Sequence, residues 1–154
     1  MQYIIDGHNL IPKLGLRLDT FDDELDLVAR LQEFCRLRRA HVEVYFDGAP
    51  PGQTGPRSAG AVTAHFVRQG SSADAAIESR LEKMGRAAKN WTVVSSDHRV
   101  QRAAQAAHAE ALSSEEFARM MSAAQAERTL QAKSDTSLSP DEVEEWLGIF
   151  KRRG

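Results

Sequence analysis

Short apolar segments that end beside an aspartate alternate with amphipathic helical patterns along this chain. Strands are predicted at residues 3–5, 42–46, 62–67 and 91–94, with a short fifth strand at 110–112. Apolar residues at three- and four-residue spacing predict helices over 21–39, 72–88, 98–107 and 114–124. This alternation predicts an α/β fold with a mostly parallel sheet covered on both faces. In such sheets, ligands bind beyond the carboxyl ends of the strands.

A segment rich in glycine and proline, residues 48–60, separates the second and third predicted strands. Its composition disfavours a helix or a central strand. Loops of this length inside a compact domain are commonly functional or mobile. We therefore expect the segment to be irregular, to be mobile without substrate, and to contact the substrate backbone through Arg57.

Four aspartates are expected to converge at one end of the predicted sheet. Asp6, Asp47 and Asp97 each follow an apolar strand, and Asp74 lies in the first turn of a helix that starts at the same end. Clustered carboxylates repel one another, so proteins keep them where a cation neutralises them or where a proton is shared. Hard oxygen ligands favour Mg2+ or Mn2+ over zinc, and such ions activate water and neutralise charge at phosphorus. Aspartate before glycine is also a common turn signal, so turn formation alone is the structural alternative.

Several polar residues near these aspartates are candidates for supporting roles. The Asn9 amide is placed to orient Asp6 or to contact a phosphate, and a cap or turn is its alternative. His8 is expected to be packed or exposed rather than a metal ligand, and Ser95 and Ser96 are expected to cap the following helix. The candidate phosphate contacts, each with a solvated side chain as its alternative, are Arg57, Arg68, Arg99 and Arg102.

The C-terminal segment is predicted to be separate from the main domain, residues 1–133. Residues 134–154 read as a polar linker, which starts near Lys133, followed by a short amphipathic helix. Val143, Trp146, Leu147 and Phe150 give that helix an apolar face. Such a face folds back on its own domain or docks on a partner, including a second copy of the chain in a homodimer.

Composition excludes several classes of protein. The 20 Lys and Arg residues against 22 Asp and Glu residues give a net charge of -2, which argues against coating nucleic acid by bulk charge. A single cysteine excludes an intramolecular disulfide framework and a cysteine-rich zinc site. No apolar run approaches the ~20 residues needed to span a bilayer, and no basic region precedes Asp6 as in a signal peptide. We therefore expect a cytoplasmic protein with no membrane partner.

Four motifs resemble the YacP-like branch of the NYN domain family, relatives of PIN-domain nucleases. They are IIDGHNLI at residues 4–11, VYFDG at 44–48, GSSADAAIE at 70–78 and TVVSSDHR at 92–99, in the family's order. The resemblance implies a PIN-like three-layer α/β/α sandwich and a divalent-metal-dependent endoribonuclease. Its metal-binding and catalytic acids would be Asp6, Asp47, Asp74 and Asp97, with Asn9 in support. Known bacterial relatives cleave messenger RNA on the ribosome, so RNA and the ribosome are the implied partners.

Two other functions compete with the ribonuclease. The first is an RNA- or ribosome-binding module without activity, supported by Ala75, where many family members carry a further acid. The second is a phosphoacceptor or phosphatase that uses a strand-end aspartate as nucleophile. No lysine follows any of these strands, and His8 stands where a dehalogenase-type phosphatase would have a second aspartate. Both observations weigh against the second alternative.

Overall fold

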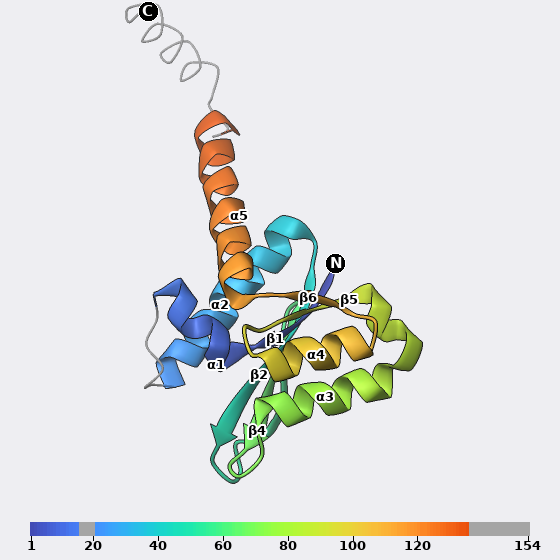
Figure 1. The fold of residues 1–154 in the computed structure, drawn as a ribbon. Coiled ribbons are helices and arrows are strands. Elements are labelled where there is room, and N and C mark those ends of the chain that lie inside the picture. The colour runs from blue at the N-terminus through green and yellow to red at the C-terminus, as the bar shows by residue number, and fades with distance from the viewer. Residues whose placement is uncertain (16–20, 136–154) are drawn as a thin grey trace, which may run out of the picture. The chain divides into compact units, whose positions relative to one another are not determined.

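A computed structural model describes residues 1–15 and 21–135 of the chain, and its elements follow the predicted alternation (Figure 1). The strands are β1 (Gln2–Asp6), β2 (His41–Ala49), β3 (Gly55–Ala59), β4 (Val62–Arg68), β5 (Trp91–Val94) and β6 (Glu110–Leu112). The helices are α1 (Gly7–Leu10), α2 (Phe21–Arg38), α3 (Ala73–Met84), α4 (His98–Ala106) and α5 (Ser114–Asp135), with 3-10 helices η1 (Ile11–Leu14) and η2 (Gly85–Asn90). The predicted C-terminal helix lies outside the described residues.

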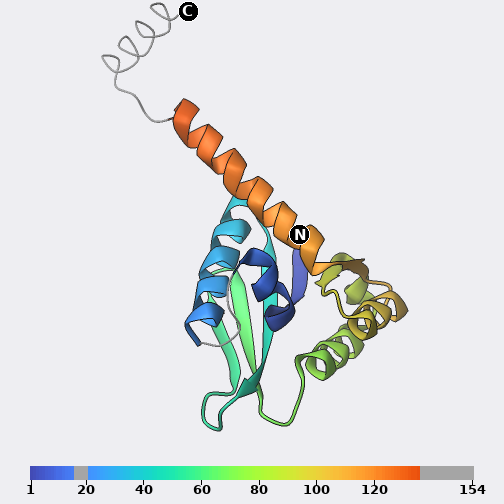
Figure 2. The same ribbon diagram turned by 60° about the vertical axis from the view of Figure 1, so that its left-hand side comes forward.

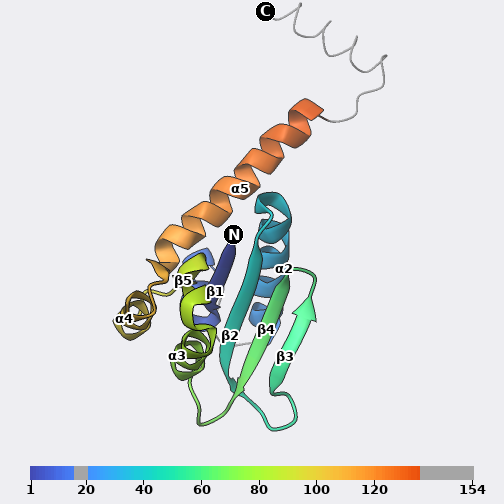
Figure 3. The same cartoon turned by 90° about the vertical axis from the view of Figure 1, so that its right-hand side faces the viewer.

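The strands form a six-stranded sheet in the order β3-β4-β2-β1-β5-β6. All neighbouring pairs are parallel except β3 and β4, which are antiparallel. β1 lies in the middle, with Ile5 opposite both Val44 of β2 and Val94 of β5. Helices cover both faces, as Figure 3 shows for α2 on one side and α3 and α4 on the other. The fold is therefore the expected three-layer α/β/α sandwich with a mostly parallel sheet.

Alternate side chains of the strands supply two apolar cores. On one face, Tyr3 and Ile5 pack with residues of α2 and with Phe117 of α5. On the other face, Ile4 and Tyr45 pack with residues of α3 and α4, the two helices that lie together in Figure 2. Because the side chains of a strand point alternately to either face, a run such as residues 3–5 must be apolar throughout when both faces are covered.

The glycine- and proline-rich segment is more regular than predicted. β2 continues to Ala49, and residues 55–59 form β3 at the edge of the sheet. The expectation of an irregular segment is wrong for these residues. Pro56 is compatible with a strand here because an edge strand does not need every N–H for pairing. The exclusion of a central strand holds for β3 but not for Gly48 and Ala49, which belong to the central strand β2.

Two helix ends also differ from the prediction. α3 ends at Met84, and Ala88 lies in η2 beyond Gly85, whose φ of +55° breaks the helix. Ala88 is nevertheless fully buried, as its apolar spacing predicted. At the C-terminal side, α5 runs to Asp135, so the first residues of the predicted linker are helical. Ser72 caps α3 as predicted, since its side chain accepts a hydrogen bond of 3.1 Å from the Ala75 N–H.

The chain divides into two compact units, residues 1–124 and residues 125–154. The first contains the whole sheet, and the described part of the second is the end of α5. Over the described ranges, none of the helices combines the length and the apolar character needed to cross a membrane.

Candidate active site

The four aspartates lie where the chain leaves the carboxyl ends of the parallel strands. Asp6 is the last residue of β1, and Asp47 lies near the end of β2. Asp74 is in the first turn of α3, after β4, and Asp97 is the N-cap of α4, after β5. The parallel registers of β1 with β2 and β5, and of β2 with β4, place these positions at one end of the sheet.

Asp6 is the most buried of the four, with 7% of its surface exposed. Burial and the negative charges of Asp74 and Asp47 raise its pKa to about 6. A hydrogen bond from the Asn9 backbone N–H and the neighbouring His8 oppose this rise. Asp6 is therefore held in a site where its charged form is disfavoured.

Asp74 also interacts electrostatically with the other site aspartates. Burial and the charge of Asp97 raise its pKa, while Arg99 and a hydrogen bond with Asp6 lower it. Asp6 and Asp74 therefore lie close enough for each to influence the ionisation of the other.

His8 lies between carboxylates from two other elements. Its Nδ1 is 2.6 Å from Oδ1 of Asp47, and its Nε2 is 2.9 Å from Oε1 of Glu24 in α2. The hydrogen bond with Glu24 raises the pKa of His8, burial opposes the rise, and Asp47 adds to it. The ring packs against Phe46, with 5.5 Å between ring centroids. Sequence reasoning missed Glu24, because its acidic position at the start of a helix had a sufficient local explanation.

Asp97 uses its side chain to start α4. Its Oδ1 accepts a hydrogen bond of 2.8 Å from the Arg99 backbone N–H. Ser95, which is fully buried, accepts a hydrogen bond of 3.1 Å from the Asp97 N–H and supports this turn, but the cap itself is Asp97 rather than the predicted serine. Ser96 differs from the prediction, because its Oγ accepts from the Ser114 N–H at the start of α5.

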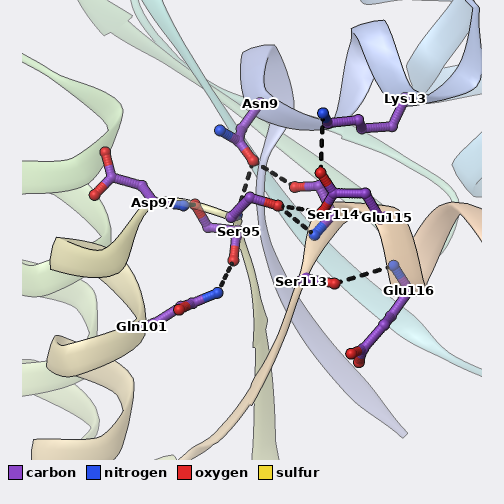
Figure 4. Close-up of polar contacts among 10 residues, drawn as sticks. Asn9, Lys13, Ser95, Asp97, Gln101, Ser113, Ser114, Glu115 and Glu116 are labelled. Atoms are coloured by element: carbon purple, nitrogen blue, oxygen red, sulfur yellow. Dashed lines mark hydrogen bonds and ion pairs between the residues drawn. The ribbon is translucent and has the colours of Figure 1, made fainter.

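Asn9 joins three segments of the chain rather than orienting Asp6 with its amide (Figure 4). Its Oδ1 accepts hydrogen bonds from the Ser96 N–H at 2.8 Å and from the Ser114 hydroxyl at 2.5 Å. Glu115, next in α5, accepts from the Ser96 hydroxyl at 2.6 Å and pairs with Lys13 of η1 at 2.9 Å. Asn9 therefore contacts Asp6 through its backbone N–H, and its side chain ties the Asp6 turn to the Asp97 turn.

The four predicted phosphate contacts have different surroundings. Arg99 is bound to Glu78 through Nε at 2.7 Å and Nη2 at 3.2 Å, close enough to Asp74 and Asp97 for those charges to act on it. Arg57 lies in β3 with its guanidinium 5.2 Å from the centroid of the Phe66 ring. Arg68 ends β4, and Arg102 is on the exposed side of α4.

The aspartates suit a hard divalent cation in their chemistry. Their oxygen atoms are the ligands such ions prefer. Burial and, after it, the charges of neighbouring aspartates raise the pKa values of Asp6 and Asp74, and a cation would relieve the repulsion between these charges. Over residues 1–15 and 21–135, however, no three His, Cys, Asp or Glu side chains are already arranged as a ligand set. A hollow of about 660 Å3 between α3 and α4 is lined by none of the four aspartates.

Comparison with known proteins gives a family match over almost the whole chain. The family model for the YacP-like NYN domain matches residues 3–149. No curated protein matches the sequence. Crystal structures of Rae1 (YacP) from Bacillus subtilis share the fold. One matches with a TM-score of 0.72 and 23% identity, covering 100% of this chain and 95% of that one. A mutant of the same protein matches with a TM-score of 0.73 and 22% identity, covering 91% and 86%.

Proposed function

The chain belongs to the YacP-like NYN domain family, and we propose that it is a divalent-metal-dependent endoribonuclease that hydrolyses RNA phosphodiester bonds. The family is a group of PIN-like nucleases, so a ribonuclease-type function accompanies membership. The finer assignment is supported by one observation above others. Asp6, Asp74, Asp47 and Asp97 lie at one end of the sheet, where burial and the charges of neighbouring aspartates raise the pKa values of Asp6 and Asp74.

These four carboxylates would hold the Mg2+ or Mn2+ ion. When bound, such an ion lowers the pKa of a coordinated water and neutralises charge on the phosphate. Asp6 and Asp74, whose pKa values are raised without a cation, would both offer charged oxygens to the bound ion. His8 holds Asp47, and Asp97 is held by its own capping contact with Arg99.

The RNA backbone would be held by arginines around this edge. Arg68 is the last residue of β4, Arg57 lies on the paired strand β3, and Arg102 lies on α4. Contacts of this kind position a nucleic acid without reading its sequence. Following the resemblance, messenger RNA on the ribosome is the proposed substrate, and the cytoplasm the proposed location. A homodimer through residues 139–150 is a separate proposal on a segment outside the described residues.

The test is cleavage of labelled RNA by the full chain with millimolar Mg2+ and with EDTA. We expect Asp74→Asn and Asp97→Asn each to lower the rate by more than the ~10–100-fold that follows loss of a residue that only orients a metal ligand. The matched control is Asp26→Asn, which removes an exposed aspartate paired with Arg30 on α2. Undiminished cleavage by both variants would refute the site.

The alternative, an RNA-binding module without activity, is favoured by the absence of a ready ligand set within the described ranges and by Ala75. It predicts RNA binding by the wild-type chain with no cleavage under either condition. The same assay, run beside a binding measurement, separates the two functions.

A further inference from the structure

Asp47 is the site aspartate that lies at an irregularity of its own strand. It lies where the pairing of β2 with β4 shifts register, between Phe46 and Ala49, and it precedes Gly48, which has a φ of +76°. Its side chain is 46% exposed. A carboxylate on such a strand end, repelled by two neighbouring acids, would turn toward solvent unless another group held it.

His8 holds the Asp47 carboxylate through a hydrogen bond, and Glu24 holds His8 through another. The two contacts use different ring nitrogens, at 2.6 Å to Asp47 and 2.9 Å to Glu24. The imidazole is also packed against Phe46, which limits rotation of the ring. Glu24 is the more buried carboxylate of the pair, at 18% exposure, and it is carried by an 18-residue helix. The contacts therefore connect helix α2, through Glu24 and His8, to the Asp47 carboxylate.

We propose that Glu24 and His8 are positioning residues that fix the Asp47 carboxylate for cation binding. The inference rests on the proposed function and adds to it two residues outside the set of four aspartates. His8 engages Oδ1 of Asp47, so Oδ2 takes no part in that contact. Groups that orient metal ligands from outside the ligand set typically change metal affinity by ~10–100-fold when they are removed.

A purely structural role is the competing explanation, since the same contacts tie α2 to the turn after β1. The Mn2+ affinity of the folded protein distinguishes the two roles. A structural tie lowers the melting temperature and leaves Mn2+ affinity unchanged well below it. A positioning role lowers Mn2+ affinity in protein that circular dichroism shows to be folded.

The experiment is calorimetric titration of the full chain with Mn2+ alone, without RNA. Glu24→Gln keeps an acceptor but loses the charge, and we expect it to weaken Mn2+ binding about 10-fold. His8→Asn keeps a donor near the position of Nδ1 but is too short to meet Glu24, so it should match Glu24→Gln. His8→Phe loses both contacts and should weaken binding further. Asp26→Asn on the same helix is the control and should bind as the wild type does.

A double-mutant cycle links the effect to Asp47. On the Asp47→Asn background, Glu24→Gln should have no further effect on Mn2+ affinity, because the carboxylate it helps to position is gone. Wild-type affinity in Glu24→Gln and His8→Phe would overturn the inference and leave the proposed function standing. An equal loss on both backgrounds would also overturn it. A wild-type chain that binds no Mn2+ and cleaves no RNA would overturn both.

Discussion

The side-chain oxygen of Asn9 accepts a hydrogen bond of 2.8 Å from the backbone N–H of Ser96, which lies 87 residues further along the chain. This contact joins the turn that follows Asp6 to the turn that carries Asp97. It also gives an acceptor to the Ser96 N–H, which lies just beyond the end of β5. The Ser114 hydroxyl donates to the same oxygen at 2.5 Å.

Loss of the Asn9 side chain should therefore destabilise the fold. Asn9→Ala leaves the Ser96 N–H and the fully buried Ser114 side chain without this acceptor. Leaving such groups unsatisfied costs about 1–3 kcal/mol, which urea denaturation would measure. Asn90→Ala, at an exposed position in η2, should change the free energy of unfolding by less than about 0.5 kcal/mol. Equal effects of the two substitutions would contradict the bridging role.

Asp6 should make the metal-free protein less stable as the pH rises. Its folded pKa of about 6 lies above the ordinary value of 3.8, so the native state binds more protons than the unfolded state between these values. The free energy of unfolding should thus fall as the pH rises from roughly 4 to 6. Asp6→Asn should raise the free energy of unfolding by on the order of 2 kcal/mol at pH 7 in EDTA. The same variant should lose Mg2+-dependent cleavage. A variant that loses both stability and cleavage would indicate a structural aspartate.

Mg2+ should stabilise the folded chain. At ten times its dissociation constant, a ligand that binds only the native state adds about 1.4 kcal/mol, or roughly 3–6 °C in melting temperature for a chain of this size. Asp74→Asn should lose part of this response, and Asp26→Asn should keep it. A wild-type melting curve indifferent to millimolar Mg2+ would mean that the folded state has no useful metal site.

Gly7→Ala should be strongly destabilising. A Cβ at this position would overlap the buried Phe46 ring and lie 3.0 Å from the Tyr45 carbonyl oxygen. Overpacking of this kind costs about 1–3 kcal/mol. The Gly52→Ala control has open space around the new Cβ and meets only the strain of a φ of +86°. Phe46→Leu replaces the ring with a smaller side chain and should offset part of the stability lost in Gly7→Ala. An absence of such compensation would contradict the clash.

Arg57 should contact RNA through phosphate alone. Arg57→Ala is expected to weaken binding to all RNA sequences alike and to reduce the slope of log K against log salt by about 1. Arg86→Ala, which removes an exposed arginine beside the hollow between α3 and α4, should leave the slope unchanged. An unaltered slope in Arg57→Ala would reject the contact.

The strand and helix pattern could be predicted from the sequence because it depends on near neighbours. Three apolar residues before Asp6 indicate a strand buried on both faces, and Ser72 indicates a helix start, from properties that act within about four residues. The position of the aspartates at one end of the sheet could also be predicted, because parallel strands present their carboxyl ends together. The motifs around them led to the family that the comparison confirmed.

Only the tertiary structure decided which side chains serve these aspartates. Glu24 lies 16 residues from His8, and Ser114 lies 105 residues from Asn9. No local periodicity reports such contacts, because they arise when the packed sheet brings helix starts and strand ends together. The same reason applies to β3, where glycine and proline disfavour a strand locally and pairing with β4 at the edge supplies the hydrogen bonds that form one.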